Sequence, residues 1–271
     1  MKKSNKILLI SLLVALLILI FLVIIVMNVL KDNEKTEQEN ETLYEFIPTG
    51  YFKIEDDLNK AKEDKVLAIS DNEKDKEKGM LSEEVYGNQF IWISVENIEK
   101  YTIQEYSKYA GYQHVPIELE EAARQSIVSD ADVEIYKKMC ESVKAYGGFY
   151  LSRYKAGEEK GKVVVKKGAT IYHDTDWKTA KQIARQFSTE NKMIGYTSSL
   201  CYEKQYEDII NQSQKSMWDL QEENTFDEWI IGNRNQRVTT MNIESRNLSS
   251  RPALETESSI GFRIMMFKNI E

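Results

Sequence analysis

Residues 130–157 read DADVEIYKKMCESVKAYGGFYLSRYKAG, and this stretch predicts a helix, a glycine turn and a strand in succession. The apolar positions of its first part recur at steps of three and four residues, as on one face of a helix: Val133, Tyr136, Met139, Cys140 and Val143. Asp130 is the expected N-cap. Gly147 and Gly148 are the expected end of the helix, because glycine tolerates a positive φ. From Phe149 onward, alternating side chains predict a strand.

Strands are also predicted on both sides of this stretch. Residues 87–95, GNQFIWISV, are largely apolar on both alternating faces, which is typical of a strand covered on two sides. The other strand predictions rest on alternation or short apolar runs: residues 44–54, 162–172, 237–243 and 261–267. Residues 245–254, SRNLSSRPAL, instead predict a turn.

Three further helices are expected. One covers the Glu-rich residues 117–126, one begins near Asp174 or Thr175, and one follows a cap at Ser198 or Ser199 and includes Cys201. Helices and strands therefore interleave without the regular rhythm of βαβ units. This order predicts an α+β fold.

The amino-terminal region predicts a single membrane span. Residues 7–30, ILLISLLVALLILIFLVIIVMNVL, are almost wholly apolar, and as a helix they extend about 36 Å, enough to cross a bilayer core of roughly 30 Å. A cleaved signal peptide is the alternative, but the apolar run is long and lacks an Ala-x-Ala-like site. The lysines within residues 1–6 predict a cytoplasmic amino terminus and an extracytoplasmic carboxyl-terminal part. The lipid bilayer is thus an expected partner.

Residues 31–43 are polar and are expected to form a solvated linker, which leaves residues 44–271 as the extracytoplasmic domain. The formal net charge of −8 argues against nucleic acid as a partner. Zinc is not expected, because Cys140, Cys201, His114 and His173 show no ligand spacing. The two cysteines fit either two buried thiols or one disulfide.

Residues 218–229, WDLQEENTFDEW, place acidic and amide side chains between two tryptophans. Carboxylate and amide oxygens are ligands that calcium prefers. The same composition also fits an acidic turn that the two tryptophans anchor.

The order of these segments resembles the formylglycine-generating enzyme, or sulfatase-modifying-factor, family, and more closely its divergent bacterial surface branch. The resemblance covers roughly residues 44–267. Its markers are Gly148 to Gly157 with the Arg153-Tyr154 pair, the element at residues 218–229, and the ending from Arg251-Pro252 to Gly261-Phe262-Arg263. It implies a C-type-lectin-like fold with little regular secondary structure and many irregular loops.

In the family, the counterpart of residues 218–229 is a loop that folds around calcium. The resemblance therefore offers Asp219, Asn224 and Asp227 as calcium ligands. Glu223 stands where the family has a glycine, and losing that glycine alters the backbone shape that aims carbonyl groups. No other cofactor is expected.

Enzymes of the family use a pair of cysteines that hold copper. The corresponding stretch here, residues 237–252, contains no cysteine and no Gly-Gly. A copper(I) site needs soft sulfur ligands. The resemblance therefore implies a catalytically inactive relative.

We accordingly expect a membrane-anchored module that binds an extracytoplasmic protein or glycan. Its candidate contact residues are the aromatic and basic residues of the late loops: Trp218, Trp229, Arg234, Arg246 and Arg251. Both tryptophans also fit buried anchors, and Arg251 and Arg263 also fit internal partners of Glu228 or of another carboxylate. An active oxidase and a structural envelope or phage-associated component are the alternative functions.

Overall fold

The computed structural model describes residues 46–54, 67–79, 84–103, 129–215, 227–234, 237–242, 247–251 and 260–270, with the single residues 23, 26, 27, 116 and 119. The chain separates into two compact units, Met1–Phe46 and Ile47–Glu271. Within the described residues, no helix is long and apolar enough to cross a membrane. The predicted span at residues 7–30 lies outside them except for residues 23, 26 and 27, and the helix predicted at 117–126 lies outside them except for residue 119.

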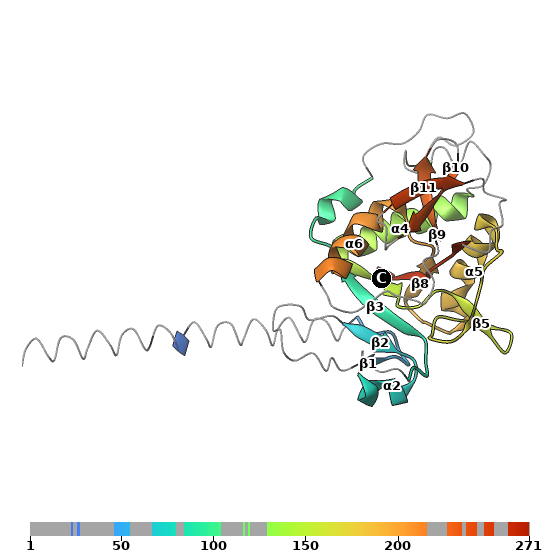
Figure 1. Cartoon of the computed structure of the whole chain (residues 1–271). Coiled ribbons are helices and arrows are strands. Elements are labelled where there is room, and N and C mark those ends of the chain that lie inside the picture. Colours follow the sequence, from blue (N-terminus) through green and yellow to red (C-terminus); the bar gives the residue numbers. More distant parts are fainter. Residues whose placement is uncertain are drawn as a thin grey trace, which may run out of the picture. The chain divides into compact units, whose positions relative to one another are not determined.

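A six-stranded antiparallel sheet forms the centre of the second unit. Its strands lie in the order β1 (Phe52–Ile54), β2 (Ala68–Ser70), β3 (Gln89–Ser94), β4 (Gly148–Ser152), β13 (Met265–Lys268) and β8 (Tyr196–Ser199). Figure 1 shows β1, β2 and β3 side by side, with α2 (Glu73–Lys78) next to β1. All residues of β4 are buried, and so are those of β3 except Ser94. The prediction of a strand covered on both faces is confirmed for β3.

Helix α4 spans Asp130–Tyr146, as predicted. Gly147 follows it in the left-handed conformation, with φ of 74°. The N-cap prediction was wrong by one residue, because Ser129, and not Asp130, accepts from the backbone of Asp132. The Asp132 carboxylate accepts in return from the Ser129 amide, and this reciprocal capping box fixes where the helix begins.

Helix α5 spans Trp177–Glu190 and begins at the N-cap Asp176. It packs on the sheet next to β8, with the Phe187 ring 5.5 Å from the Phe90 ring of β3. The Ser188 amide donates to the Ser198 hydroxyl of β8 at 2.9 Å. The helix is therefore held against an edge strand of the sheet by both apolar and polar contacts.

The helix predicted from Ser198 or Ser199 is wrong in its start. Both serines lie in β8, where they pair with β13, and α6 (Tyr206–Lys215) begins later, after a short 3-10 helix at Glu203–Gln205. Cys201 accordingly lies between β8 and that 3-10 helix and not in a helix. Pairing with β13 explains the difference, because tertiary contacts override local helix propensity.

Two smaller sheets complete the unit. One has the order β11 (Asn247–Arg251), β10 (Arg237–Asn242), β9 (Asp227–Arg234) and β12 (Ile260–Gly261), in which β12 runs parallel to β9. The other has the order β6 (Lys162–Val164), β5 (Gly157–Glu159) and β7 (Thr170–Ile171). For most of β9, β10 and β11 the structure describes the backbone alone.

These sheets correct three local predictions. Residues 245–254 do not form only a turn, because β11 pairs along β10. Residues 162–172 form two strands, β6 and β7, that flank β5. Of the predicted strand at 44–54, the structure describes residues 46–54, and among these Phe52–Ile54 is the strand.

The antiparallel sheets and separate helices confirm the α+β class. The family resemblance implied little regular secondary structure, but residues 129–215 form three α-helices and five strands joined by short connections. A regular framework thus positions the polar groups described next.

Candidate functional site

The structure describes only some of the site residues that the sequence predicts. Trp218, Asp219, Asn224 and Arg246 lie outside the described residues. Asp227 begins β9 opposite Ile260, Arg234 ends β9, and Arg251 pairs with Val238 at the end of β11, all described by backbone only. No group of three or more His, Cys, Asp or Glu side chains suited to a metal occurs among the described residues.

Trp229 is an internal anchor and not a surface contact in this structure. Its side chain is 1% exposed, and its ring nitrogen donates to the Thr175 carbonyl at 2.8 Å. Trp177, at the start of α5, donates in the opposite direction to the Ile230 carbonyl at 2.9 Å. The two indoles therefore join α5 to β9 through a reciprocal pair of hydrogen bonds, the arrangement expected of buried tryptophans.

Glu228, the residue before Trp229, forms a buried ion pair. Arg263 donates from Nε to Glu228 Oε1 at 2.8 Å, and both side chains are almost fully buried. Arg263 Nη1 also donates to the carbonyl oxygens of Ser152 and Arg153. The guanidinium thus connects the end of β4 in the large sheet with β9 in the second sheet. Of the two arginines that fitted Glu228 in the sequence, Arg263 is its partner.

Both cysteines are buried thiols, and they form no disulfide bond. Burial raises the pKa of the Cys201 thiol, and the nearby Glu228 carboxylate raises it further, while Arg263 opposes the increase. The open alternative between two thiols and one disulfide is resolved in this structure in favour of two thiols. A thiol with a raised pKa is a poor nucleophile and a poor metal ligand, because both roles need the thiolate.

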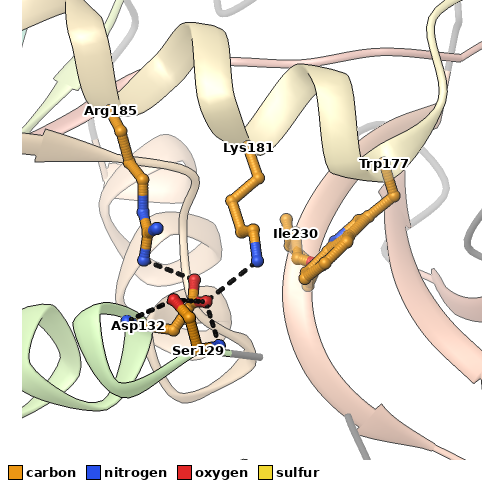
Figure 2. A network of polar contacts seen from close by, with 6 residues as sticks. All are labelled: Ser129, Asp132, Trp177, Lys181, Arg185 and Ile230. Atoms are coloured by element: carbon orange, nitrogen blue, oxygen red, sulfur yellow. Dashed lines mark hydrogen bonds and ion pairs between the residues drawn. The ribbon is translucent and has the colours of Figure 1, made fainter. Parts of the chain in front are cut away.

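A group of buried and half-buried charges lies around Asp132, in the first turn of α4. Figure 2 shows Lys181 and Arg185 of α5 reaching Asp132 from one side, with Ser129 beside it. Lys181 Nζ donates to Asp132 Oδ2 at 3.0 Å, and Arg185 donates to Oδ1. Ser129 adds its amide at 2.6 Å and its hydroxyl at 2.8 Å, both to Oδ2. We call Ser129, Asp132, Lys181 and Arg185 the Asp132 centre.

Lys181 is unusually buried for a lysine, because its residue is only 6% exposed. Burial lowers the pKa of Lys181, and the charge and hydrogen bond of Asp132 oppose that decrease. Its ammonium group also lies 4.5 Å from the centroid of the Trp177 ring, in the range of a cation–π interaction. Asp132 and Trp177 therefore compensate for the loss of water around the lysine.

Ser199, the last residue of β8, and Tyr202, in the segment after β8, lie beside the same centre. The Tyr202 ring packs edge-on against Tyr136, one helical turn after Asp132, with ring centroids 5.0 Å apart. Burial raises the pKa of Tyr202, a side-chain hydrogen bond with Ser199 opposes the increase, and the charges of Asp132 and Arg185 act in opposite directions. The fold thus gathers side chains from α4, α5 and the end of β8.

The sequence analysis did not identify this centre. Two local signals were present: the Ser129-x-x-Asp132 spacing of a capping box, and Lys181 with Arg185 one turn apart on one helix face. Neither signal shows that the two faces meet. The donors described for the centre are directed to the Asp132 carboxylate, so the centre joins α4 to α5.

Comparison of the chain with models of protein families, with curated proteins and with solved structures finds no match. The family resemblance of the sequence therefore rests on the residues quoted for it.

Proposed function

We propose that this protein is a membrane-anchored, extracytoplasmic binding module and a non-catalytic relative of the formylglycine-generating enzymes. In this proposal residues 7–30 hold the chain in the bilayer, and residues 44–271 contact a protein or glycan outside. Catalysis of the family type would need two exposed thiolates that hold copper.

The single observation that carries the non-catalytic part is the state of Cys201. Its side chain is 2% exposed, and burial beside Glu228 raises the pKa of its thiol. Cys140 is buried in α4 as well. A buried thiol with a raised pKa does not supply the soft anionic ligand that copper(I) requires.

The internal use of charges supports a scaffold role. Arg263 and Glu228 tie two sheets together, and Lys181 and Arg185 tie α5 to α4 through Asp132. Such contacts fix the framework on which the late loops are carried. A rigid framework that presents variable loops is a common basis for binding. Calcium at Asp219, Asn224 and Asp227 would shape one of those loops.

One experiment tests the proposal on the full-length protein purified in detergent. The protein is incubated with copper(I) and oxygen together with a cysteine-containing peptide, and both bound copper and aldehyde formation are measured. We expect neither above the level of a Cys140→Ser, Cys201→Ser double variant. Cysteine-dependent copper binding with conversion of the peptide would establish the oxidase alternative instead.

The membrane part of the proposal has a separate test. In intact cells, a cysteine introduced into residues 31–43 should react with a thiol reagent that does not cross membranes, whereas one introduced into residues 1–6 should not. The reverse labelling pattern would contradict the proposed orientation. Recovery of the whole chain in the soluble fraction would contradict the anchor.

A further inference from the structure

The turn between β2 and α2 brings two carboxylates together. Asp71 directly follows β2, and Asp75, in α2, is only 1% exposed. The two side chains are close enough to act on each other as like charges. Among the residues that the structure describes, no lysine or arginine forms an ion pair with either of them. A buried carboxylate without a counter-charge depends on hydrogen-bond donors for its compensation.

The donors come mainly from residues 86–89, which lead into β3 and which we call the strap. The amides of Tyr86 and Gly87 donate to Asp75 Oδ1 and Oδ2, at 2.9 and 3.0 Å. The Gln89 side chain donates to Oδ2 of the same carboxylate at 3.1 Å. One buried carboxylate therefore holds both ends of the strap.

Asp71 holds the strap at its third residue, Asn88. The Asn88 amide donates to Asp71 Oδ1 at 2.7 Å, and its side-chain nitrogen donates to Oδ2 at 2.6 Å. Asn88 Oδ1 accepts in turn from the Val165 amide at 2.7 Å, and the Gln89 amide donates to the Val165 carbonyl at 3.0 Å. Val165 directly follows β6. The strap thus links the two carboxylates to the three-stranded sheet.

The strap approaches the turn so closely that position 87 needs a glycine. An added Cβ there would lie 2.4 Å from Asp71 Oδ1 and 2.5 Å from the Ser70 hydroxyl oxygen, which is closer than real Cβ atoms come. Asp71 Oδ1 is therefore covered by the strap. Release of the strap would return this oxygen to water.

The neighbours of Asp71 determine how its charge responds to pH. Burial raises the pKa of Asp71 and the charge of Asp75 raises it further, while the hydrogen bonds from Asn88 act against the increase. Tyr51, just before β1, also faces this carboxylate, because the charge of Asp71 adds to the effect of burial in raising the pKa of Tyr51. The folded protein consequently keeps a proton on Asp71 more readily than a solvated aspartate does.

The cations of the surrounding elements are directed to other groups. On α2, Lys74 Nζ lies 5.1 Å from the centroid of the Tyr86 ring, and Lys78 pairs with Glu84 at 2.6 Å. Arg153, which directly follows β4, donates to the side chain of the last strap residue at 2.8 Å and not to either carboxylate. The repulsion between the two carboxylates is therefore not cancelled by a positive charge.

We propose that the strap is a pH-sensitive clasp, which is tight when Asp71 is protonated and loosens when Asp71 carries a negative charge beside Asp75. A protonated carboxyl group still accepts hydrogen bonds, so the contacts with the strap persist in acid. In the loosened state Asp71 meets water and titrates near the ordinary value for aspartate, about 3.9. The clasp does not depend on the proposed membrane anchor or on the proposed binding role of the domain.

The direction of the pH dependence follows from proton linkage. The closed clasp has the higher pKa at Asp71, so it retains a proton that the loosened state has released. Its stability is fully present below the ordinary value and is lost as the pH rises through the raised pKa. Because one proton is involved, the equilibrium constant for opening rises by up to about tenfold per pH unit in that window.

Hydrogen exchange of the full-length protein in detergent tests the proposal. The amides of Gly87 and Asn88 are followed at several pH values between about 4 and 8, and each rate is divided by the intrinsic rate at that pH. We expect their protection to fall as the pH rises, by up to about tenfold per unit. The amide of Leu151 in β4 reports on the core and should not show this decline.

Asp71→Asn removes the titrating group, so the protection of the strap amides should no longer depend on pH. Asp71→Ser serves the same purpose should Asp71→Asn fail to fold. Glu77→Gln is the matched control, because Glu77 is an exposed carboxylate on the same short helix. It should keep the decline of the unchanged protein.

Three results would overturn the proposal. One is protection of the strap amides that does not change with pH in the unchanged protein. Another is an equal decline in both Asp71 variants, which would assign the effect to a different group. The third is an equal decline at Leu151, which would show that the whole domain, and not the strap, opens.

Discussion

Arg263 donates to Glu228 across 2.8 Å in the buried interior, and this contact joins the end of the large sheet to β9 of the second sheet. The two residues are far apart in the sequence. Arg263 also donates to two backbone carbonyls, whereas Glu228 Oε2 accepts no hydrogen bond from the residues that the structure describes. The buried charge of Glu228 is therefore balanced by its contact with Arg263.

Replacing Arg263 by methionine should destabilise the protein by about 3–5 kcal/mol, because it leaves the Glu228 carboxylate buried without a counter-charge. Replacing both residues, Arg263→Met with Glu228→Leu, should cost less than the single change. Urea denaturation followed by tryptophan fluorescence measures both. Lys78→Met, which removes the exposed pair with Glu84, is the control and should leave the midpoint nearly unchanged. A double variant less stable than the single one would contradict the prediction.

Asp132→Asn should destabilise the protein by about 3 kcal/mol, since it leaves Lys181 and Arg185 side by side without their shared negative charge. The neighbouring Asp130→Asn is the matched control, because Asp130 is exposed and lies in the same helical turn. Only a small change is expected there. The denaturation midpoints of the two variants measure the difference. An equal loss of stability in both would show that negative charge at the start of the helix, and not the buried ion pairs, stabilises the protein.

Stability should fall as the pH rises above about 8.5–9. The pKa of the Cys201 thiol is raised in the folded protein, so above its unfolded value the unfolded chain loses a proton that the folded chain retains. The free energy of unfolding then decreases by up to about 1.4 kcal/mol per pH unit for this group.

Cys201→Ala removes this contribution and should flatten the decline between pH 9 and about 10, where the buried tyrosines begin to contribute in the same direction. Denaturation curves at several pH values measure the slope. An identical slope in the variant would mean that the Cys201 thiol ionises as readily in the folded state as in the unfolded chain.

Gly148→Ala should cost about 3 kcal/mol, because an added Cβ would lie 2.4 Å from the Ile93 carbonyl and 2.6 Å from the Trp92 ring. Gly147→Ala is the matched neighbour. It meets no atom within 4 Å but has a φ of 74°, so only backbone strain of about 1 kcal/mol opposes it. Melting temperatures of the two variants should differ accordingly. The opposite order would show that close packing of β4 on β3 is not the constraint at Gly148.

Helix α4 and strand β3 could be predicted from local patterns. The apolar steps from Val133 to Val143 define a helix face, and Gly147 marks its end. The N-cap could also have been found, since Ser129 and Asp132 have the spacing of a capping box. These features depend on residues within one or two helical turns of each other.

The candidate site could not be predicted in this way. Ser198 and Ser199 fit a helix cap locally, but pairing with β13 makes them part of β8. Residues 247–251 fit a turn locally, but pairing with β10 makes them β11. The deciding partner of β8 is a strand far along the chain, whereas that of β11 is the strand directly before it.

The sequence by itself determined the α+β class, the main helix with its glycine end, and the buried central strand, because hydrophobic period and glycine conformation act over short distances. Only the tertiary structure decided that Lys181 and Arg185 share Asp132, that Arg263 neutralises Glu228, and that Trp229 is an anchor. Those outcomes depend on which faces meet when the chain folds. Once these groups are buried, each charge needs a partner of opposite sign, and no local sequence pattern specifies that partner.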